Sequence, residues 1–201
     1  MKVKYSDLKN KRVFITGGGS GIGGSIVEHF CEQGSEVYFV DIDLKETKKL
    51  LNKIKKNKFR TPTFIECNLL DINKLEKTIK NIIAKKGPIH ALVNNAANDD
   101  RHTTDQVDEK YWENRMAINL KHYFFAAKAV VKSMKKMKAG SIVNLSSVSW
   151  MLGEGDKVVY ETAKSAVVGL TRSFAQEYGK YNIRTNSVVP GSIATERQIK
   201  H

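Results

Sequence analysis

Short apolar runs alternate with longer segments of helical periodicity along this chain of 201 residues. The apolar runs are rich in β-branched residues, as buried strands are, and they cover residues 12–16, 36–40, 63–67, 91–94, 141–145 and 184–189. The helical segments between them cover residues 21–33, 44–57, 72–86, 111–137 and 160–180. Strands that are apolar on both faces and alternate with helices predict an α/β fold, in which helices cover both sides of a parallel sheet.

The order of these elements also predicts the arrangement of the strands. Right-handed crossovers make such a sheet doubly wound, with strand order 3-2-1-4-5-6. Ligands bind these sheets at the carboxyl ends of the strands, where the order reverses, so Thr16 and Asn94 should flank a binding site. The chain has no internal repeat and only 3 Pro, so we expect a single domain over residues 1–201.

Composition argues against several other classes of protein. Lysines account for most of the net charge of +13, and they are scattered along the chain apart from one dense stretch at residues 45–60. This stretch has helical periodicity, which favours a solvated helix face over a surface that binds nucleic acid. No apolar run is long enough for a membrane span. Cys31 and Cys67 lack metal-ligand spacing, so we expect buried thiols in a reducing cytoplasm and no metal site.

A glycine-rich turn follows the first apolar run. The nine residues that begin at Thr16 hold six of the 14 glycines. Glycine lets the backbone approach a ligand closely, and the N-terminus of the next helix offers free N–H groups, so the turn predicts a pyrophosphate cradle. The relevant spacing is Gly17-x-x-x-Gly21-x-Gly23, although the generic fingerprint G-x-G-x-x-G also fits from Gly19. A glycine-rich loop without a ligand is the alternative.

The second apolar run ends at Asp41, which lies 18 residues after Gly23. A carboxylate at this place accepts hydrogen bonds from the adenosine ribose hydroxyls of a dinucleotide and repels a 2′-phosphate. This position therefore predicts NAD as the cofactor. The alternative is a carboxylate that only begins a loop.

Candidate catalytic groups follow the fifth apolar run. Tyr160 and Lys164 are four residues apart on a helical pattern, so their side chains share one helix face. A phenol is a poor base at neutral pH, and a nearby ammonium favours the phenolate. Ser147 lies thirteen residues before Tyr160 at the end of a strand, so its hydroxyl can share a substrate oxygen with the phenol. Asn119, inside an apolar helix, is either a local kink or a satisfied core amide.

Taken together, these motifs resemble the short-chain dehydrogenase/reductase family along essentially the whole chain. The family's Thr-Gly-x-x-x-Gly-x-Gly falls on residues 16–23, and its Asn-Asn-Ala-Gly falls on residues 94–97, with Ala97 in place of the usual Gly. Its Tyr-x-x-x-Lys falls on residues 160–164 and its Pro-Gly on residues 190–191. The resemblance implies a Rossmann-like sheet and an oxidoreductase that acts on CH–OH donors.

The resemblance also implies roles for single residues. Tyr160 is expected to donate or accept the proton, Ser147 to orient the substrate oxygen, Lys164 to favour the phenolate and hold the nicotinamide ribose, and Asn119 to complete a proton relay. Ser20 is uncharged where NADP enzymes of the family often have a basic residue, and Asn68 replaces the usual Asp beside the adenine. The expected cofactor contacts are Gly17, Ser20, Gly21, Ile22, Gly23, Asp41, Asn68, Leu69, Asn95, Tyr160, Lys164, Ile193 and Thr195.

The loop after the fourth strand suggests the substrate. Its polar residues 98–102, the Trp150 stretch and residues 195–198 resemble aldose 1-dehydrogenases that act on galactose, arabinose, fucose or xylose. We therefore expect hydride transfer from the C1 hydroxyl of an aldose to NAD, which leaves a lactone. The expected substrate contacts are Ser147, Tyr160, Asn98, Arg101, His102 and Trp150. The alternatives are an NADPH-dependent 3-ketoacyl reductase, a non-catalytic NAD-binding protein and a merely solvated loop.

The end of the chain adds one expectation. Members of the family continue after the Pro-Gly motif through a further helix and a seventh strand, and this chain stops at His201. We expect strand seven to be missing, so that the sixth strand keeps an open edge. At full length we expect a homo-oligomer.

Overall fold

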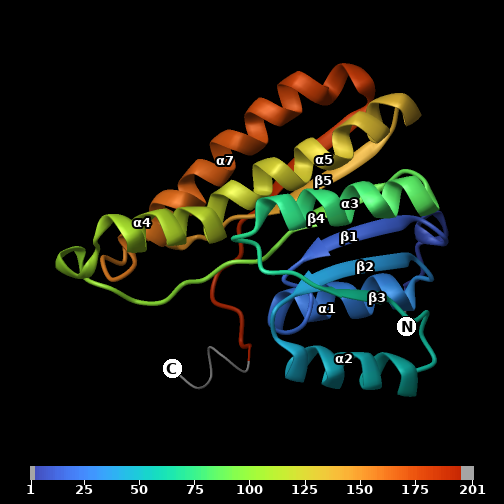
Figure 1. The fold of residues 1–201 in the computed structure, drawn as a ribbon, viewed down its shortest axis with the longest axis horizontal. Coiled ribbons are helices and arrows are strands. Elements are labelled where there is room, and N and C mark those ends of the chain that lie inside the picture. The colour runs from blue at the N-terminus through green and yellow to red at the C-terminus, as the bar shows by residue number, and fades with distance from the viewer. Residues whose placement is uncertain (1–2, 196–201) are drawn as a thin grey trace.

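The computed structural model describes residues 3–195 and contains one parallel sheet of six strands (Figure 1). The strand order is β3-β2-β1-β4-β5-β6, which confirms the predicted order. In the described part of the chain no strand pairs with the outer edge of β6. Each strand begins and ends within one residue of its predicted bounds; the strands are β1 (Arg12–Thr16), β2 (Glu36–Asp41), β3 (Thr63–Glu66), β4 (Ala91–Asn94), β5 (Gly140–Leu145) and β6 (Ile183–Val188).

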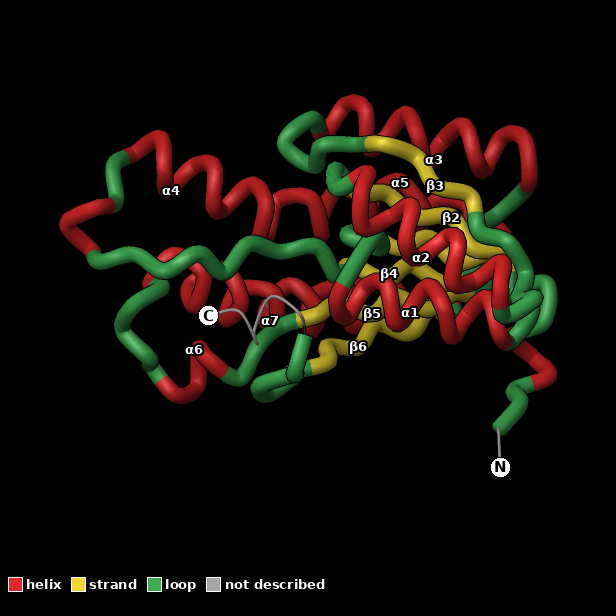
Figure 2. The backbone as a smooth tube through the Cα atoms, turned by 90° about the horizontal axis from the view of Figure 1, so that it is seen from below, coloured by secondary structure: helices red, strands yellow, loops and turns green. Residues whose placement is uncertain are grey.

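Helices cover both faces of the sheet. In Figures 1 and 2, α1 (Gly21–Glu32) and α2 (Leu44–Lys56) lie on one face, and α3 (Ile72–Lys86), α5 (His122–Met137) and α7 (Val158–Tyr178) lie on the other. The shorter helical segments are η1 (Ser6–Leu8), η2 (Thr104–Gln106), α4 (Glu109–Met116), η3 (Ala117–Lys121), α6 (Ser149–Leu152) and η4 (Gly179–Tyr181). Among the described residues, none of the helices combines the length and the apolar character that a membrane crossing requires.

Alternation along the strands divides the core in two. In β1, Val13 and Ile15 pack into the cluster under α1 and α2, whereas Phe14 packs into the larger cluster under α3, α5 and α7. Successive strand side chains point to opposite faces, so a strand that is covered on both sides is apolar at every position. This explains the unbroken apolar runs in the sequence.

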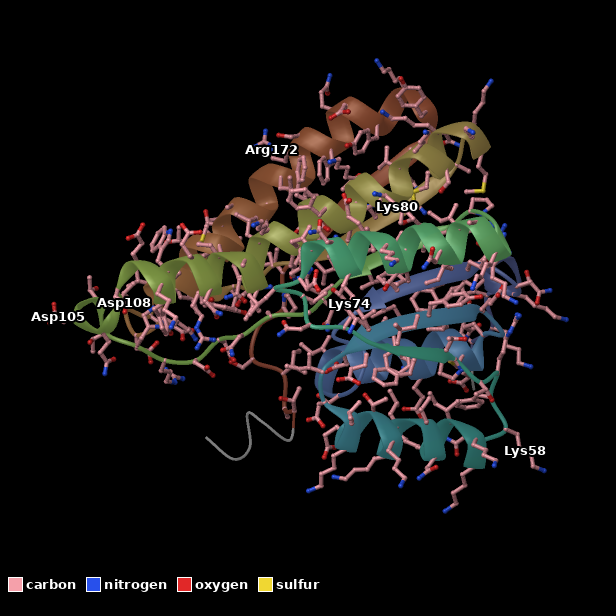
Figure 3. All side chains as sticks on the ribbon, in the orientation of Figure 1. Lys58, Lys74, Lys80, Asp105, Asp108 and Arg172 are labelled. Carbon is pink, nitrogen blue, oxygen red and sulfur yellow. The ribbon has the colours of Figure 1, made fainter. Side chains whose placement is uncertain are left out.

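The lysines lie on the outside of this core. In α2 only Thr47 and Ile54 are buried, and all the lysines of the helix are exposed. Figure 3 shows Lys58, just after α2, and Arg172 on α7 extending away from the sheet. The lysine-rich stretch therefore forms the solvated helix face that its periodicity predicts.

The segment predicted as one helix over residues 111–137 has a more complex structure. It consists of α4, a π-helical turn and α5, and the π-helical turn is η3, Ala117–Lys121. Asn119 lies in the middle of this turn and is fully buried. Such π-helical insertions are frequent at functional sites, because the additional residue changes the direction of a side chain.

Candidate active site

A cleft of about 570 Å³ opens at the carboxyl ends of the strands, beside the neighbouring strands β1 and β4, where the strand order reverses. In Figure 1 the strand arrows point toward this end of the molecule. The side chains at the rim come from six different loops, as the rule for doubly wound sheets predicts. The predicted site residues that line the cleft are Gly17, Ser20, Ile22, Gly23, Asp41, Asn68, Leu69, Asn95, Asn98, Arg101, Ser147, Tyr160, Ile193 and Thr195.

The glycine turn is shaped by close backbone contacts. A Cβ atom on Gly23 would lie 1.8 Å from the carbonyl oxygen of Gly17, so no other residue fits there. Gly17 and Gly21 have φ angles of +66° and +52°, which side-chain-bearing residues rarely adopt. Ser20, the N-cap of α1, makes no side-chain capping bond, so the first N–H groups of the helix stay available. The turn therefore fits the pyrophosphate of a dinucleotide.

Hydrogen bonds join this turn to the end of β4. The Thr16 hydroxyl oxygen accepts from the backbone N–H of Asn95 at 3.0 Å and of Ala96 at 3.2 Å. The Asn95 amide donates to the carbonyl oxygen of Gly17 at 2.9 Å. Asn95 therefore links the loop after β1 to the loop after β4, and this link sets the width of the cleft at the switch point.

Asp41 lies at the end of β2, and its carboxylate is oriented by the backbone. One oxygen accepts from the Gly19 N–H at 2.8 Å, and the other accepts from the N–H groups of Ile42 at 2.7 Å and Asp43 at 3.0 Å. Backbone donors hold this carboxylate in place at the rim of the cleft. Its place matches the ribose-binding carboxylate of dinucleotide folds.

Tyr160 and Lys164 occupy the first two turns of α7, and the Lys164 side chain is almost fully buried. Lys164 Nζ donates to the Leu145 carbonyl oxygen at 2.7 Å and to the Tyr123 hydroxyl at 2.9 Å. Burial lowers the pKa of Lys164 from 10.5 to about 7, and the carboxylate of Asp99 opposes this shift. A lysine with a lowered pKa beneath a cleft-lining phenol is a strong sign of acid–base chemistry.

Ser147 follows β5 and lines the same cleft as Tyr160. Its hydroxyl lies 2.9 Å from the Ser149 hydroxyl and accepts from the Ser149 N–H at 3.2 Å. These contacts fix the rotamer of Ser147 and leave it one position for a ligand: a lone pair if Ser147 donates to Ser149, or its proton if Ser149 donates. Ser149 is an additional polar group in the cleft that the sequence did not single out.

Asn119 does not line the cleft. Its side-chain oxygen accepts from the Asn98 N–H at 2.8 Å, and its amide donates to the Asn98 carbonyl oxygen at 3.0 Å. Both alternatives considered from the sequence apply, since the residue lies in a helix irregularity and its amide is satisfied. The visible effect of Asn119 is to anchor the loop after β4, and its part in a proton relay stays a prediction.

His102 and Trp150 lie away from the cleft, in contrast to their expected place at the substrate. The His102 ring is buried, with Nδ1 2.9 Å from the Tyr111 hydroxyl, and Nε2 accepts from the Val159 N–H at 3.2 Å. Both ring nitrogens therefore have protein partners, one of them at the start of α7. Trp150 is partly buried on α6, and its ring is outside the set of side chains that line the cleft.

Arg101 does line the cleft, where it forms an ion pair with Asp156 in the loop before α7. The same loop contributes Glu154 and Lys157, an ion pair that sequence reasoning missed. They could have been found by extending the carboxyl-end rule to the loop after β5. Part of the stretch that suggested an aldose enzyme, residues 196–198, lies outside the described residues.

Within residues 3–195 no group of three or more His, Cys, Asp or Glu side chains is arranged to hold a metal ion. A dinucleotide cradle beside a Tyr–Lys pair and a serine hydroxyl defines a different class of site. It is that of a nicotinamide-dependent dehydrogenase, in which the cofactor carries the hydride and the protein handles the proton.

The comparisons with known proteins agree with this class. The family model described as short chain dehydrogenase matches residues 11–201, and the chain belongs to this family. It is 40% identical over 195 residues to a probable galactose dehydrogenase of Rhizobium meliloti, covering 97% of this chain and 76% of that one. It is 43% identical over 196 residues to a D-xylose 1-dehydrogenase of Caulobacter vibrioides, covering 98% and 77%. A solved structure of the Thermoplasma acidophilum aldohexose dehydrogenase is similar at a TM-score of 0.83, with 33% identity over 96% of this chain and 70% of that one.

Proposed function

We propose that this enzyme oxidises the C1 hydroxyl of a cyclic aldose to a lactone, with NAD as the hydride acceptor. The observation that carries the proposal is the polar rim of the cleft around Tyr160, formed by Asn98, Asp99, Arg101 and the Glu154–Lys157 ion pair. Side chains of this kind bind the several hydroxyls of a sugar, whereas an acyl chain requires an apolar wall. The relatives named for galactose, xylose and aldohexose oxidation support the same substrate class.

The proposal of NAD over NADP rests on the charge at the adenosine end of the cleft. Asp41 supplies a carboxylate there, and the neighbouring rim residues, Ser20, Ile42 and Asp43, bring no positive charge. The basic side chains that line the cleft, Arg101 and Lys157, belong to the loops near Tyr160 instead. A 2′-phosphate would meet a negative charge without a cation to balance it.

The chemistry of the protein side chains follows from their positions. Ser147 and Tyr160 would hold the C1 hydroxyl of the sugar between them, and the Tyr160 phenolate would take its proton at Oη. Lys164 stabilises the phenolate through its positive charge, because opposite charges in a buried site attract strongly. The nicotinamide, when bound, accepts the hydride from C1. Reduction of a lactone would use the same groups in reverse.

The test is a panel of substrates and cofactors with the purified protein. Galactose, arabinose, fucose, xylose and glucose are each incubated with NAD or NADP, and the absorbance of the reduced nicotinamide is followed. A short 3-ketoacyl thioester with NADPH tests the reductase alternative. We expect NAD reduction with at least one aldose and no thioester reduction. Reduction of the thioester in preference to oxidation of any aldose would contradict the proposal.

Two further parts of the proposal concern the setting of the enzyme. Cys31 and Cys67 are free, buried thiols, which suits a reducing cytoplasm. Phe124 on α5 is 44% exposed and Trp112 on α4 is 38% exposed, which suits burial against a second copy of the chain. Light scattering at several protein concentrations tests this, and a strictly monomeric mass would contradict a homo-oligomer.

A further inference from the structure

Tyr123 lies on α5 and is fully buried below the active-site cleft. Its hydroxyl accepts a hydrogen bond from Lys164 Nζ at 2.9 Å and donates to the Leu145 carbonyl oxygen at 2.9 Å. Lys164 Nζ also donates to that carbonyl oxygen, at 2.7 Å. The three groups form a closed triangle in which every member contacts the other two.

We propose that Tyr123 is a positioning residue that holds the Lys164 side chain beneath Tyr160 and stabilises its charged form. An ammonium group has three N–H donors, and in this triangle two of them have acceptors. The third has no acceptor within this triangle. Because Lys164 is buried, a lost acceptor cannot be replaced by bulk water.

The other groups that face Lys164 do not take over this role. Burial lowers the pKa of His122, next to Tyr123 on α5, to about 3, so its ring stays neutral at working pH. Asp99, in the loop after β4, favours the ammonium through its charge. Tyr160, on the same helix as Lys164, carries the reacting hydroxyl, and its ring centroid lies 5.5 Å from Lys164 Nζ. Tyr123 is therefore the side chain whose hydrogen bond supports the ammonium directly.

The Tyr123 hydroxyl is itself suited to the task. Burial raises the pKa of Tyr123 well above its ordinary value, so the hydroxyl stays protonated. Its proton has the Leu145 carbonyl oxygen at 2.9 Å as the near acceptor and the Ala96 carbonyl oxygen at 3.5 Å as a more distant one. Its lone pairs then point away from the Leu145 carbonyl and accept from Lys164. A hydrogen bond to a charged donor is stronger than one to a neutral amine, so the bond favours the ammonium over the amine.

The test compares Tyr123→Phe with Tyr38→Phe. Tyr38 is also a buried tyrosine, and its hydroxyl bonds Glu36 far from Lys164. Thermal unfolding of the protein without cofactor is followed from pH 6 to pH 9. We expect the loss in Tm caused by Tyr123→Phe to be about 2–4 °C larger at pH 6 than at pH 9, because the lost bond matters most when Lys164 is charged. The loss caused by Tyr38→Phe should be the same at both ends.

The pH–rate profile gives the second readout, and this part rests on the proposed function. Without the Tyr123 hydroxyl, Lys164 loses its proton more readily and Tyr160 becomes a phenolate only at higher pH. We expect the pH–rate profile to move to higher pH by about one unit. The rate of aldose oxidation should then fall about tenfold near neutral pH and approach the wild-type rate at alkaline pH. Tyr38→Phe should leave the profile unchanged.

Two results would overturn the proposal. The first is a Tm loss for Tyr123→Phe that is the same at pH 6 and pH 9. The second is a rate of aldose oxidation that is lowered by the same factor at every pH. Either result would mean that the Tyr123 side chain only fills space. If the Phe variant unfolds too readily to measure, Tyr123→Met, which fills much of the same volume without an acceptor, replaces it under the same criteria. A pH-dependent Tm loss in a protein that oxidises no aldose would contradict the substrate assignment and leave the role of Tyr123 intact.

Discussion

Lys164 Nζ lies 5.5 Å from the centroid of the Tyr160 ring, one turn further along the same helix. The ammonium is thus close enough to stabilise a phenolate, and the phenol lines the cleft while the lysine does not. From this division we propose that Tyr160 contacts the substrate and that Lys164 supplies the charge.

The first prediction follows from that division. Tyr160→Phe removes the hydroxyl that exchanges the proton, so kcat for aldose oxidation should fall by about 10²–10⁴. The affinity for NAD, measured by calorimetry, should change by less than about threefold, since most of the expected cofactor contacts lie elsewhere in the cleft. Tyr181→Phe, in η4 and outside the cleft, is the control and should keep full activity. Retention of kcat by Tyr160→Phe would remove it from the catalytic role.

Replacing the buried lysine should stabilise the protein while it inactivates it. In Lys164→Met the Tyr123 hydroxyl still donates to the Leu145 carbonyl oxygen, so both groups stay paired. Removal of a buried ammonium is then expected to raise the free energy of unfolding by about 1 kcal/mol or more at pH 6.

The sign of the pH dependence follows from the pKa of Lys164, which burial lowers to about 7 in the folded chain. Between pH 7 and the pKa of an unfolded lysine, near 10.4, the unfolded chain binds more protons at this site, so the wild type gains stability as pH rises. The advantage of Lys164→Met should therefore shrink from pH 6 to pH 9. Urea unfolding of both proteins at each pH measures this, and an advantage that grows with pH would contradict it.

Asp41 should decide between the two nicotinamide cofactors. Asp41→Ala removes the carboxylate at the end of β2, and with it the repulsion of a 2′-phosphate and the bonds to the ribose hydroxyls. The ratio of kcat/KM for NAD to that for NADP should fall by about tenfold or more, as expected for the loss of a charged hydrogen bond. Asp43→Ala is a close control, although its side chain caps α2 and its loss should lower Tm slightly. Equal use of both cofactors by the wild type would refute the NAD assignment.

Arg101 is one of the predicted substrate contacts that line the cleft, together with Asn98, Ser147 and Tyr160. Arg101→Ala should raise KM for the best aldose by about fivefold to tenfold, as for one lost hydrogen bond, and leave the affinity for NAD nearly unchanged. Arg172→Ala, an exposed arginine on the outer face of α7 (Figure 3), is the matched control. Identical KM values for the two variants would remove Arg101 from the substrate site.

His102 should matter for stability rather than for sugar binding. His102→Ala removes a buried ring and leaves the Val159 N–H at the start of α7 without its acceptor. The free energy of unfolding should fall by about 2 kcal/mol or more. His29→Ala, at an exposed position on α1, should change it by less than about 0.5 kcal/mol. A wild-type Tm for His102→Ala, together with a raised KM for the sugar, would restore the contact expected from the sequence.

The sequence alone determined the sheet and the chemistry at its edge. Apolar runs such as residues 12–16 predict buried strands because both faces of a covered strand must be apolar. The glycine turn, Asp41 and the Tyr160–Lys164 pair are local patterns, each readable within a few residues. Handedness and the switch-point rule then place them at one site, because the carboxyl ends of parallel strands meet at one edge.

Only the tertiary structure decided the direction of single side chains in the loops and the partners of buried polar groups. His102 faces inward because Tyr111 and Val159, 9 and 57 residues further along the chain, lie on either side of its ring. Tyr123 lies beneath Lys164, 41 residues away, because α5 and α7 pack side by side on the sheet. Periodicity tells which face of a helix is buried, but it carries no information about which residue of another element faces it. That depends on how the elements pack, which many distant contacts determine together.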